Sequence, residues 1–187
     1  MAKRTEFFIL VDEFMTTKDN LLILGAGQYG QVTKEIAEST GQFEKIDFLD
    51  DNVENAVGKI ADYKKFAGNY SYAIVAIGNA DLRLAYIREL ERSCFRIAIL
   101  ISPKAYVSHS AQIKQGSIVE PFAVVNANSF VGEGTLICAG AIVNHNAVVG
   151  DACQLDCGSV VEANAVVPDK TKLGSNKVFS RDGKILG

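Results

Sequence analysis

An aliphatic side chain recurs at every sixth position from residue 101 to residue 173, without a single exception. A small side chain follows four residues after each of these positions, until Lys177 ends the pattern. This period predicts a parallel β-helix, because one short rung cannot bury its own apolar face and the rungs must stack to share a core. A β-sandwich would instead show alternating strands with irregularly spaced turns. The aliphatic positions are Ile101, Val107, Ile113, Val119, Val125, Val131, Ile137, Val143, Val149, Leu155, Val161, Val167 and Leu173.

The chain before the repeat has the order of a small nucleotide-binding α/β unit. An apolar run at 21–24 is typical of a buried strand, and it leads into a G-x-G-x-x-G sequence at 25–30. A helix is expected over 31–40 and a second strand at 46–49, followed by two aspartates. Glycines let the backbone approach phosphate oxygens, and a helix N-terminus offers free N–H groups to an anion. This order predicts a Rossmann-like unit; the same glycines would also serve a tight strand-to-helix turn.

Two further strands and a second helix complete this unit. Strands are expected at 72–77 and 95–100, and the latter runs directly into the first rung of the repeat. An amphipathic helix is expected over 81–92, with Leu82 on its apolar side and Arg83 on its solvated side. At about 80 to 100 residues, the unit is short for a full NAD-binding domain with two mononucleotide halves.

We therefore expect two domains, a small Rossmann-like domain at residues 1–100 and a β-helix at residues 101–187. Residues 1–19 are predicted to be an N-terminal extension that forms a strand or short helix packed on the first domain. The apolar run at 7–11 is too short to span a bilayer, and it lacks the pattern of a signal peptide.

Charge and cysteine content narrow the possible partners. The net charge is −3 and there is no basic run, so we expect neither nucleic acid nor a membrane as a partner. The four cysteines form no paired C-x-x-C, and with two histidines in the chain we expect no metal site. Cys153 holds a small inward position of the repeat and is predicted to be a packed thiol. Cys94, Cys138 and Cys157 are predicted to be free thiols of a reducing cytoplasm.

The repeat resembles that of the hexapeptide-repeat acyltransferases, whose left-handed β-helices turn once per three hexapeptides. Joined to a short Rossmann-like unit, it resembles the nucleotide-sugar N-acetyltransferases of the bacillosamine pathway and the related sialic-acid-type O-acetyltransferases. The resemblance runs from about residue 21 to residue 154. Three segments carry it: F-L-D-D at 48–51, A-I-G-N at 76–79, and E-P-F followed by V-N-A within 120–127.

The resemblance implies an acetyl-CoA-dependent N- or O-acetyltransferase that acts on a UDP-linked amino sugar for surface glycan biosynthesis. It also implies a homotrimer, with acetyl-CoA in the groove between neighbouring prisms and a UDP-sugar, rather than NAD, in the first domain. By the same resemblance, the glycine turn faces the phosphates and the aspartates lie near the uridine. The residues assigned to the nucleotide sugar are Gly25, Gly27, Gln28, Tyr29, Gly30, Asp50, Asp51, Gly78 and Asn79. The residues assigned to acyl-CoA are Gln154 and Gly158.

His145 is the expected general base. The family has a histidine inside an E-H-E or E-H-D sequence, and N-H-N stands at that place here, at 144–146. A neutral imidazole suits general-base work near neutral pH, since it can take the proton of an amine or hydroxyl that attacks a thioester. His145 is third in its six, away from the core positions, with Ala127 and Ala163 one coil below and above. The alternative is an exposed corner histidine, which is the interpretation we favour for His109.

Asn146 stands where the family has an acidic residue beside the histidine. An amide accepts a hydrogen bond from the ring, but it does not stabilise an imidazolium by charge. Asparagine also tolerates left-handed backbone angles, and Asn128, Asn146 and Asn164 form one column of the repeat. A corner role therefore stands beside a catalytic one. Two further departures are Tyr29, in place of the family's glycine-turn histidine, and Gln154, where many members have a second histidine.

Three other functions remain as alternatives. A non-catalytic trimeric binder of a nucleotide sugar would keep the first-domain site and have a degenerate CoA groove, since the family's further coils do not follow Leu173. An NAD-linked oxidoreductase would use the glycine motif alone, but the first domain is small and no separate catalytic domain follows. A γ-class carbonic anhydrase is also built on a β-helix, but it needs three histidine ligands and this chain has two histidines.

Overall fold

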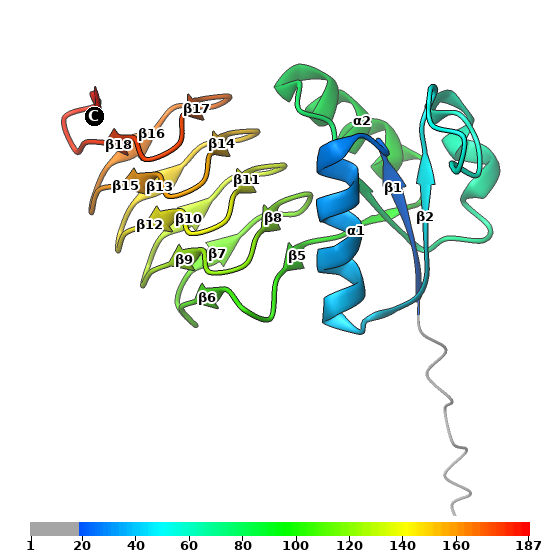
Figure 1. Cartoon of the computed structure of the whole chain (residues 1–187), viewed down its shortest axis with the longest axis horizontal. Helices are drawn as coiled ribbons and strands as arrows, with labels where there is room; N and C mark the ends of the chain where they lie inside the picture. Colours follow the sequence, from blue (N-terminus) through cyan, green and yellow to red (C-terminus); the bar gives the residue numbers. More distant parts are fainter. Residues whose placement is uncertain (1–18) are drawn as a thin grey trace, which may run out of the picture.

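The computed structural model describes residues 19–187 and contains an α/β unit beside a triangular prism (Figure 1). The prediction for residues 1–19 lies outside the described residues, apart from Asp19. Within the described part of the chain, no helix has the length and apolar character needed to cross a membrane.

Seven elements make up the α/β unit: β1 (Asp19–Leu24), α1 (Gln28–Thr40), β2 (Phe43–Leu49), η1 (Ile60–Phe66), β3 (Tyr72–Val75), α2 (Ala80–Arg92) and β4 (Arg96–Ile97). The four strands are parallel, in the order β2-β1-β3-β4. β1 is central, and its residues 21–24 are fully buried, which explains the uninterrupted apolar run. α1 ends at Gly41, whose φ of 65° carries no Cβ penalty in glycine. The Rossmann-like unit is confirmed.

The prism has three faces, each a sheet of two-residue strands. Face 1 contains β5 (Leu100–Ile101), β8 (Ile118–Val119), β11 (Leu136–Ile137), β14 (Gln154–Leu155) and β17 (Lys172–Leu173). Face 2 contains β6 (Tyr106–Val107), β9 (Val124–Val125), β12 (Ile142–Val143), β15 (Val160–Val161), β18 (Val178–Phe179) and β19 (Ile185–Leu186). Face 3 contains β7 (Gln112–Ile113), β10 (Phe130–Val131), β13 (Val148–Val149) and β16 (Val166–Val167). The chain passes from face 1 to face 2 to face 3 and returns.

The predicted left-handed β-helix is confirmed, and its period has a direct physical cause. The second residue of each strand from β5 to β18 points inward, and these residues form one continuous core with the small side chains of the corners. Strands one coil apart pair in parallel, as Val131 does with Ile113 and Val149. At one corner Asn128, Asn146 and Asn164 adopt φ of 57°, 58° and 63°. This column therefore takes the left-handed conformation that the sequence predicted for asparagine.

The prism completes the α/β unit, because it covers part of one face of that unit's sheet. The outward residues of its first three rungs on face 1, Leu100, Ile118 and Leu136, are buried against β1 and β3 in the cluster that also contains Ile36 of α1. α2 and η1 cover the opposite side of the sheet. A short α/β unit is sufficient here, since the prism takes the place of further helices.

The strand predicted at 95–100 is wrong as one element. β4 ends at Ile97, and Leu100 already belongs to β5 in face 1. The break lets the chain leave one sheet and enter another within three residues. Both β4 and β5 pair in parallel with strands of their own sheets.

The prediction that Arg83 is solvated is also wrong. Arg83 is fully buried, and its guanidinium donates hydrogen bonds to carbonyl oxygens of the prism and of the chain after β3. Leu82, expected on the apolar side, is 50% exposed. The helix is rotated relative to the simple amphipathic expectation, because it packs against a corner of the prism as well as against its own sheet.

α2 runs along the corner between face 3 and face 1 with a matching rise. Glu91 near its end is hydrogen-bonded to Gln115, Arg88 forms an ion pair with Glu133 at 2.7 Å, and near its start Asp81 bonds Lys170 at 2.6 Å. Ten helical residues rise about 15 Å, and three rung spacings of about 4.8 Å give nearly the same length. The helix is therefore aligned with the prism axis, with one contact on each of four rungs when the hydrogen bond from Arg83 to Ala152 is included.

Candidate functional site

The glycine turn contains three glycines. At Gly25 and Gly30 a side chain would be strained or would clash, whereas at Gly27 there is room for one. A Cβ on Gly30 would lie 2.2 Å from the carbonyl oxygen of Gly25, so helix α1 can start this close to β1 only with glycine there. Gly25 itself has φ of 103°. Gly27, the N-cap of α1, has nothing within 4 Å of the position of a Cβ. Its missing side chain leaves open space in front of the helix N-terminus, where a ligand can approach the backbone.

The N-terminus of α1 is available to an anion. Gly27 provides no side-chain cap, and no acidic residue lies in the first helical turn. The first N–H groups of a helix have no intrahelical partner, and together with the helix dipole they favour negative charge. A phosphate group placed over the turn would complete this terminus.

Asp50 stabilises the glycine turn through hydrogen bonds from backbone N–H groups to its carboxylate. One carboxylate oxygen accepts the N–H of Ala26 at 2.8 Å and the other accepts the N–H of Asn52 at 2.9 Å. These backbone hydrogen bonds hold the pKa of Asp50 below its usual value. Asp51 accepts the N–H of Ile60 at 3.2 Å and so connects the same loop to η1. Both aspartates predicted to contact the nucleotide thus also shape the loop that would hold it.

Gly78 and Asn79 lie beside the glycine turn at the carboxyl end of β3. A Cβ on Gly25 would be 3.0 Å from the carbonyl oxygen of Ala76, which shows how closely the two segments approach. Asn79 is the N-cap of α2, and its side-chain oxygen accepts the N–H of Leu82 at 3.0 Å. The structure therefore brings all the residues predicted to bind the nucleotide to one edge of the sheet, where parallel α/β units bind ligands.

Tyr29 differs from the other residues of the turn, because its side chain reaches towards the prism. Its hydroxyl is buried and has no hydrogen-bond partner among the described residues. Burial, followed by the nearby Glu120 and Cys138, raises the pKa of Tyr29 well above its usual value. Glu120 is 8% exposed and accepts the N–H of Ala139 at 3.0 Å. Through this cluster the glycine turn lies next to the corner between face 1 and face 2.

His145 lies on another corner, between β12 of face 2 and β13 of face 3, and it is exposed. Its Nδ1 is 3.0 Å from the side-chain amide nitrogen of Asn146. If that nitrogen donates, the ring proton is on Nε2. With the amide turned over, its oxygen accepts from Nδ1–H, and only then is Nε2 free to act as a base. Asn146 also has corner geometry, with φ of 58° and its N–H bonded to the oxygen of Ala127.

The two residues predicted to contact acyl-CoA lie on and beside face 1. Gln154 is an outward residue of β14, and its amide donates to Asp156 at 2.7 Å. Gly158 has φ of 70°, and a Cβ there would be 2.4 Å from the side-chain oxygen of Asn176. The fold alone explains that glycine, since a larger residue would disrupt the corner column.

A single chain does not bring all of these groups to one corner. The glycine turn and Gly158 lie at the corner between face 1 and face 2, whereas His145 is at the next corner along the chain, across the width of face 2. His109 is exposed on the same corner as His145, two coils lower.

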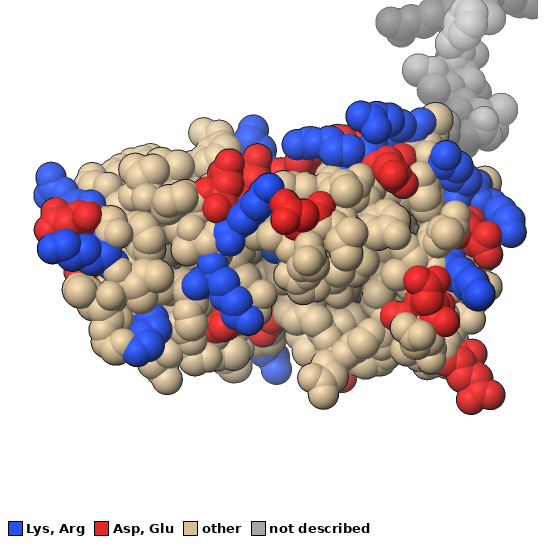
Figure 2. Space-filling model, turned by 90° about the horizontal axis from the view of Figure 1, so that it is seen from above, with Lys and Arg blue, Asp and Glu red and all other residues tan. Residues whose placement is uncertain are grey.

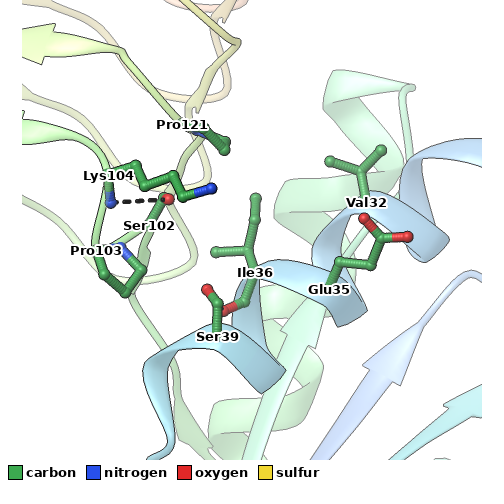
Figure 3. A pocket seen from close by; sticks show the side chains of 8 residues that line it. All are labelled: Val32, Glu35, Ile36, Ser39, Ser102, Pro103, Lys104 and Pro121. Carbon is green, nitrogen blue, oxygen red and sulfur yellow. Dashed lines mark hydrogen bonds between the residues drawn. The ribbon is translucent and has the colours of Figure 1, made fainter.

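A groove that the sequence gave no reason to expect lies between α1 and the prism (Figure 3). It has a volume of about 340 Å³ and contains apolar side chains such as Ile36, Pro103 and Pro121, with Lys104 across from Glu35. None of the residues predicted to bind a ligand lines it. Only the tertiary structure reveals this groove, because its two walls come from segments 63 to 89 residues apart in the sequence.

The prediction that Cys153 is a packed thiol is confirmed. All four cysteines are free, and Cys153 is fully buried. Burial raises the pKa of Cys153 to about 11, so its thiol stays protonated and unreactive near neutral pH.

Comparisons with known proteins agree with this architecture. Residues 20–90 match the family model of the PglD N-terminal domain. The acetyltransferase domain of PglB from Neisseria gonorrhoeae is 26% identical over 86% of this chain and 90% of that one, with a TM-score of 0.76. The same domain in complex with acetyl coenzyme A is matched over 90% of this chain and its own full length, at 24% identity and a TM-score of 0.78.

A variant of perosamine N-acetyltransferase from Caulobacter crescentus, in complex with CoA and GDP-perosamine, has a TM-score of 0.69. It is 21% identical, over 90% of this chain and 97% of that one. No curated protein matches the sequence. The resemblance of this chain to the nucleotide-sugar acetyltransferases of the hexapeptide-repeat family is confirmed.

Proposed function

We propose that this protein is an acetyl-CoA-dependent acetyltransferase that acts on a UDP-linked amino sugar as a homotrimer. One observation carries the proposal: the chain joins an open, Asp50-braced helix N-terminus to a prism whose corner exposes an imidazole that the fold does not need. The first feature suits a nucleotide diphosphate, and the second suits proton transfer to or from a substrate held outside the prism.

The nucleotide half of the proposal rests on the carboxyl edge of the sheet. The diphosphate lies over Gly27 and the first N–H groups of α1, where no side chain intervenes. The base and ribose lie towards the loop that Asp50 and Asp51 organise. Gly78 leaves a further open position at the same edge, since nothing lies within 4 Å of a Cβ placed there.

In the proposed acetyl transfer, His145 is the general base. The amine of the sugar attacks the thioester carbonyl of acetyl-CoA, and Nε2 of His145 takes the proton that the nitrogen loses. The tetrahedral intermediate then expels the CoA sulfur, which leaves as the thiol after the imidazolium returns a proton. Asn146 positions the ring in the required tautomer when its amide oxygen accepts from Nδ1–H.

A trimer would bring the two halves together. The outward residues of face 2 and face 3, on either side of the His145 corner, are largely apolar, including Tyr106 (59% exposed), Val148 (39%) and Val166 (65%). Apolar stripes of this kind mark association surfaces. Figure 2 views the molecule from above rather than onto these two faces, and it shows charged side chains of both signs interspersed with uncharged ones. A closed ring of chains then places His145 of one chain against the nucleotide of its neighbour.

The sequence resemblance supports UDP as the nucleotide, and the length of the prism supports the CoA site. UDP follows from the sequence resemblance, and GDP is the alternative, because perosamine N-acetyltransferase was crystallised with GDP-perosamine. The alignment of this chain with the full length of the PglB domain structure that contains acetyl-CoA supports a prism long enough for a CoA groove. Gln154 and the Gly158 corner lie along the part of face 1 above the α/β unit and supply that groove.

Acetyl transfer is tested by incubating the protein with acetyl-CoA and UDP-linked or GDP-linked amino sugars, and following CoA thiol release and the acetylated product by mass spectrometry. Transfer to a UDP-sugar is expected. Transfer only to a GDP-sugar would change the nucleotide and keep the reaction. Nucleotide binding without any acetyl-CoA binding at millimolar concentration would favour the non-catalytic binder.

A further inference from the structure

Arg83 has the largest of the fully buried side chains, and all of its hydrogen-bond acceptors are neutral. Nε donates to the oxygen of Gly134 at 2.6 Å and Nη2 donates to that of Ala152 at 2.8 Å. Nη1 donates to the oxygens of Ile77 at 2.6 Å and Gly78 at 3.1 Å. The guanidinium thus connects the end of β3 to two coils of the prism.

The charge of Arg83 has no partner within the described protein. Among residues 19–187, no carboxylate forms an ion pair with it. Burial lowers its pKa, but an arginine stays protonated in proteins. A buried charge without a counter-charge is strongly unfavourable. A neutral side chain with N–H groups could also donate hydrogen bonds to these carbonyl oxygens. The hydrogen bonds alone therefore do not explain why a charged arginine occupies this position.

The guanidinium lies beneath the edge that the proposed nucleotide site occupies. Ile77, whose oxygen it holds, is in contact range of Gly25, since a Cβ on that glycine would be 3.3 Å from the Ile77 side chain. Tyr29, on the first turn of α1, is close enough for its hydroxyl to respond to the charge of Arg83. The open face of the same turn is where an anion would bind.

We propose that Arg83 is the buried counter-charge of the substrate's diphosphate, acting through the packed backbone of the glycine turn without touching the ligand. The inference rests on the proposed function and deepens it: Arg83, together with the α1 N-terminus, makes the site select a nucleoside diphosphate over an uncharged nucleoside. In a medium of effective dielectric about 20, one unit charge acting on another over about 12 Å changes affinity on the order of tenfold.

The test compares UDP with uridine by calorimetry, in the wild-type protein and in two variants at Arg83. Arg83→Gln keeps donors for the carbonyl groups but removes the charge, and it is expected to weaken UDP about tenfold while changing uridine affinity little. Arg83→Lys keeps the charge but lacks the several planar N–H donors of the guanidinium. It is expected to retain the wild-type ratio of UDP to uridine affinity. Arg88→Gln is the matched control on the same helix, because Arg88 is paired with Glu133 and is half exposed.

The affinities of the two Arg83 variants test the proposed counter-charge, and those of the wild-type protein test the proposed function. An unchanged affinity ratio in Arg83→Gln, or loss of the ratio in Arg83→Lys, overturns the proposed counter-charge. If Arg83→Gln does not fold, the pH dependence of Arg83→Lys decides, because a buried lysine loses its charge as the pH rises. The counter-charge predicts that the ratio of UDP to uridine affinity falls as this lysine is deprotonated, whereas a purely structural role predicts the same ratio at every pH. A wild-type protein that binds neither UDP nor GDP contradicts the proposed function itself, whatever the variants do.

Discussion

Face 1 and the corner of His145 are built from the same repeat but present opposite surfaces. On face 1 the outward residues Leu100, Ile118 and Leu136 are buried beneath the α/β unit. On the corner between face 2 and face 3, His145 and Asn146 are exposed, and nothing in the described chain covers them. The inward residues are equivalent in both places. The outward residues alone decide where the prism docks and where it is free for chemistry.

The largest expected effect is on catalysis at the free corner. His145→Ala is expected to lower kcat about 10²–10⁴-fold, because it removes the proposed base while leaving the prism core intact. Steady-state kinetics with acetyl-CoA and the amino-sugar nucleotide measure this. His109→Ala, exposed two coils lower, is the control and should retain full activity. A loss smaller than tenfold in His145→Ala would refute the assignment of the base.

The next effect is on stability at the docked face. Ile118→Ala is expected to destabilise the protein by about 2–5 kcal/mol, since it opens a cavity in the core shared by the two units. Urea unfolding is the measurement. Lys172 is in the same column of face 1 as Ile118, but it lies above the α/β unit and is exposed. Lys172→Ala is therefore expected to change the free energy of unfolding by less than about 0.5 kcal/mol. Equal effects of the two substitutions would contradict the difference drawn between covered and uncovered rungs.

The free faces are tested by assembly. Val166→Lys places a charge on the most exposed aliphatic residue of face 3, and it is expected to shift a trimer towards monomers. Light scattering coupled to size-exclusion chromatography gives the mass. The same substitution should leave the urea unfolding of the isolated chain nearly unchanged, since Val166 is 65% exposed. A wild-type protein that is monomeric would remove the proposed trimer.

A smaller effect is expected where Asp50 braces the glycine turn. Asp50→Ala is expected to weaken UDP-sugar binding about tenfold and to leave acetyl-CoA affinity unchanged, because it removes hydrogen bonds from a carboxylate to the Ala26 and Asn52 N–H groups. Since its folded pKa is lowered, the contribution of Asp50 is present above its unfolded pKa and is lost as the pH falls through the folded pKa. If Asp50→Ala binds the UDP-sugar as tightly as the wild-type protein does, Asp50 has no role in nucleotide binding.

The smallest effect concerns Asn146. Asn146→Asp supplies the charge that the amide lacks and is expected to raise kcat a few-fold, because a carboxylate holds Nδ1–H and stabilises the imidazolium. The backbone at this position tolerates aspartate nearly as well as asparagine. A pH–rate profile measures the change. An unaltered profile would assign Asn146 to the corner column alone, beside Asn128 and Asn164.

The predictions that succeeded are those in which one residue type reports on its own backbone. The six-residue period fixed the inward positions, because only stacked rungs bury a lone aliphatic, and the asparagine column gave the left-handed corner. Gly25 and Gly30 predicted the turn, since no larger residue fits there. Helical amphipathicity, by contrast, placed Arg83 and Leu82 wrongly. It treats a helix as having one buried face, whereas α2 packs against two partners.

By itself the sequence determined a parallel β-helix, a Rossmann-like unit before it, and the glycine turn that leads from β1 into α1. Local periodicity and the steric limits of glycine and asparagine suffice for these features. Only the tertiary structure decided that the prism completes the sheet, that Arg83 is buried without a counter-charge, and that His145 and the glycine turn occupy different corners. Those outcomes depend on which outward side chains of distant segments meet, and the free energy of such contacts belongs to the pair rather than to either stretch of chain.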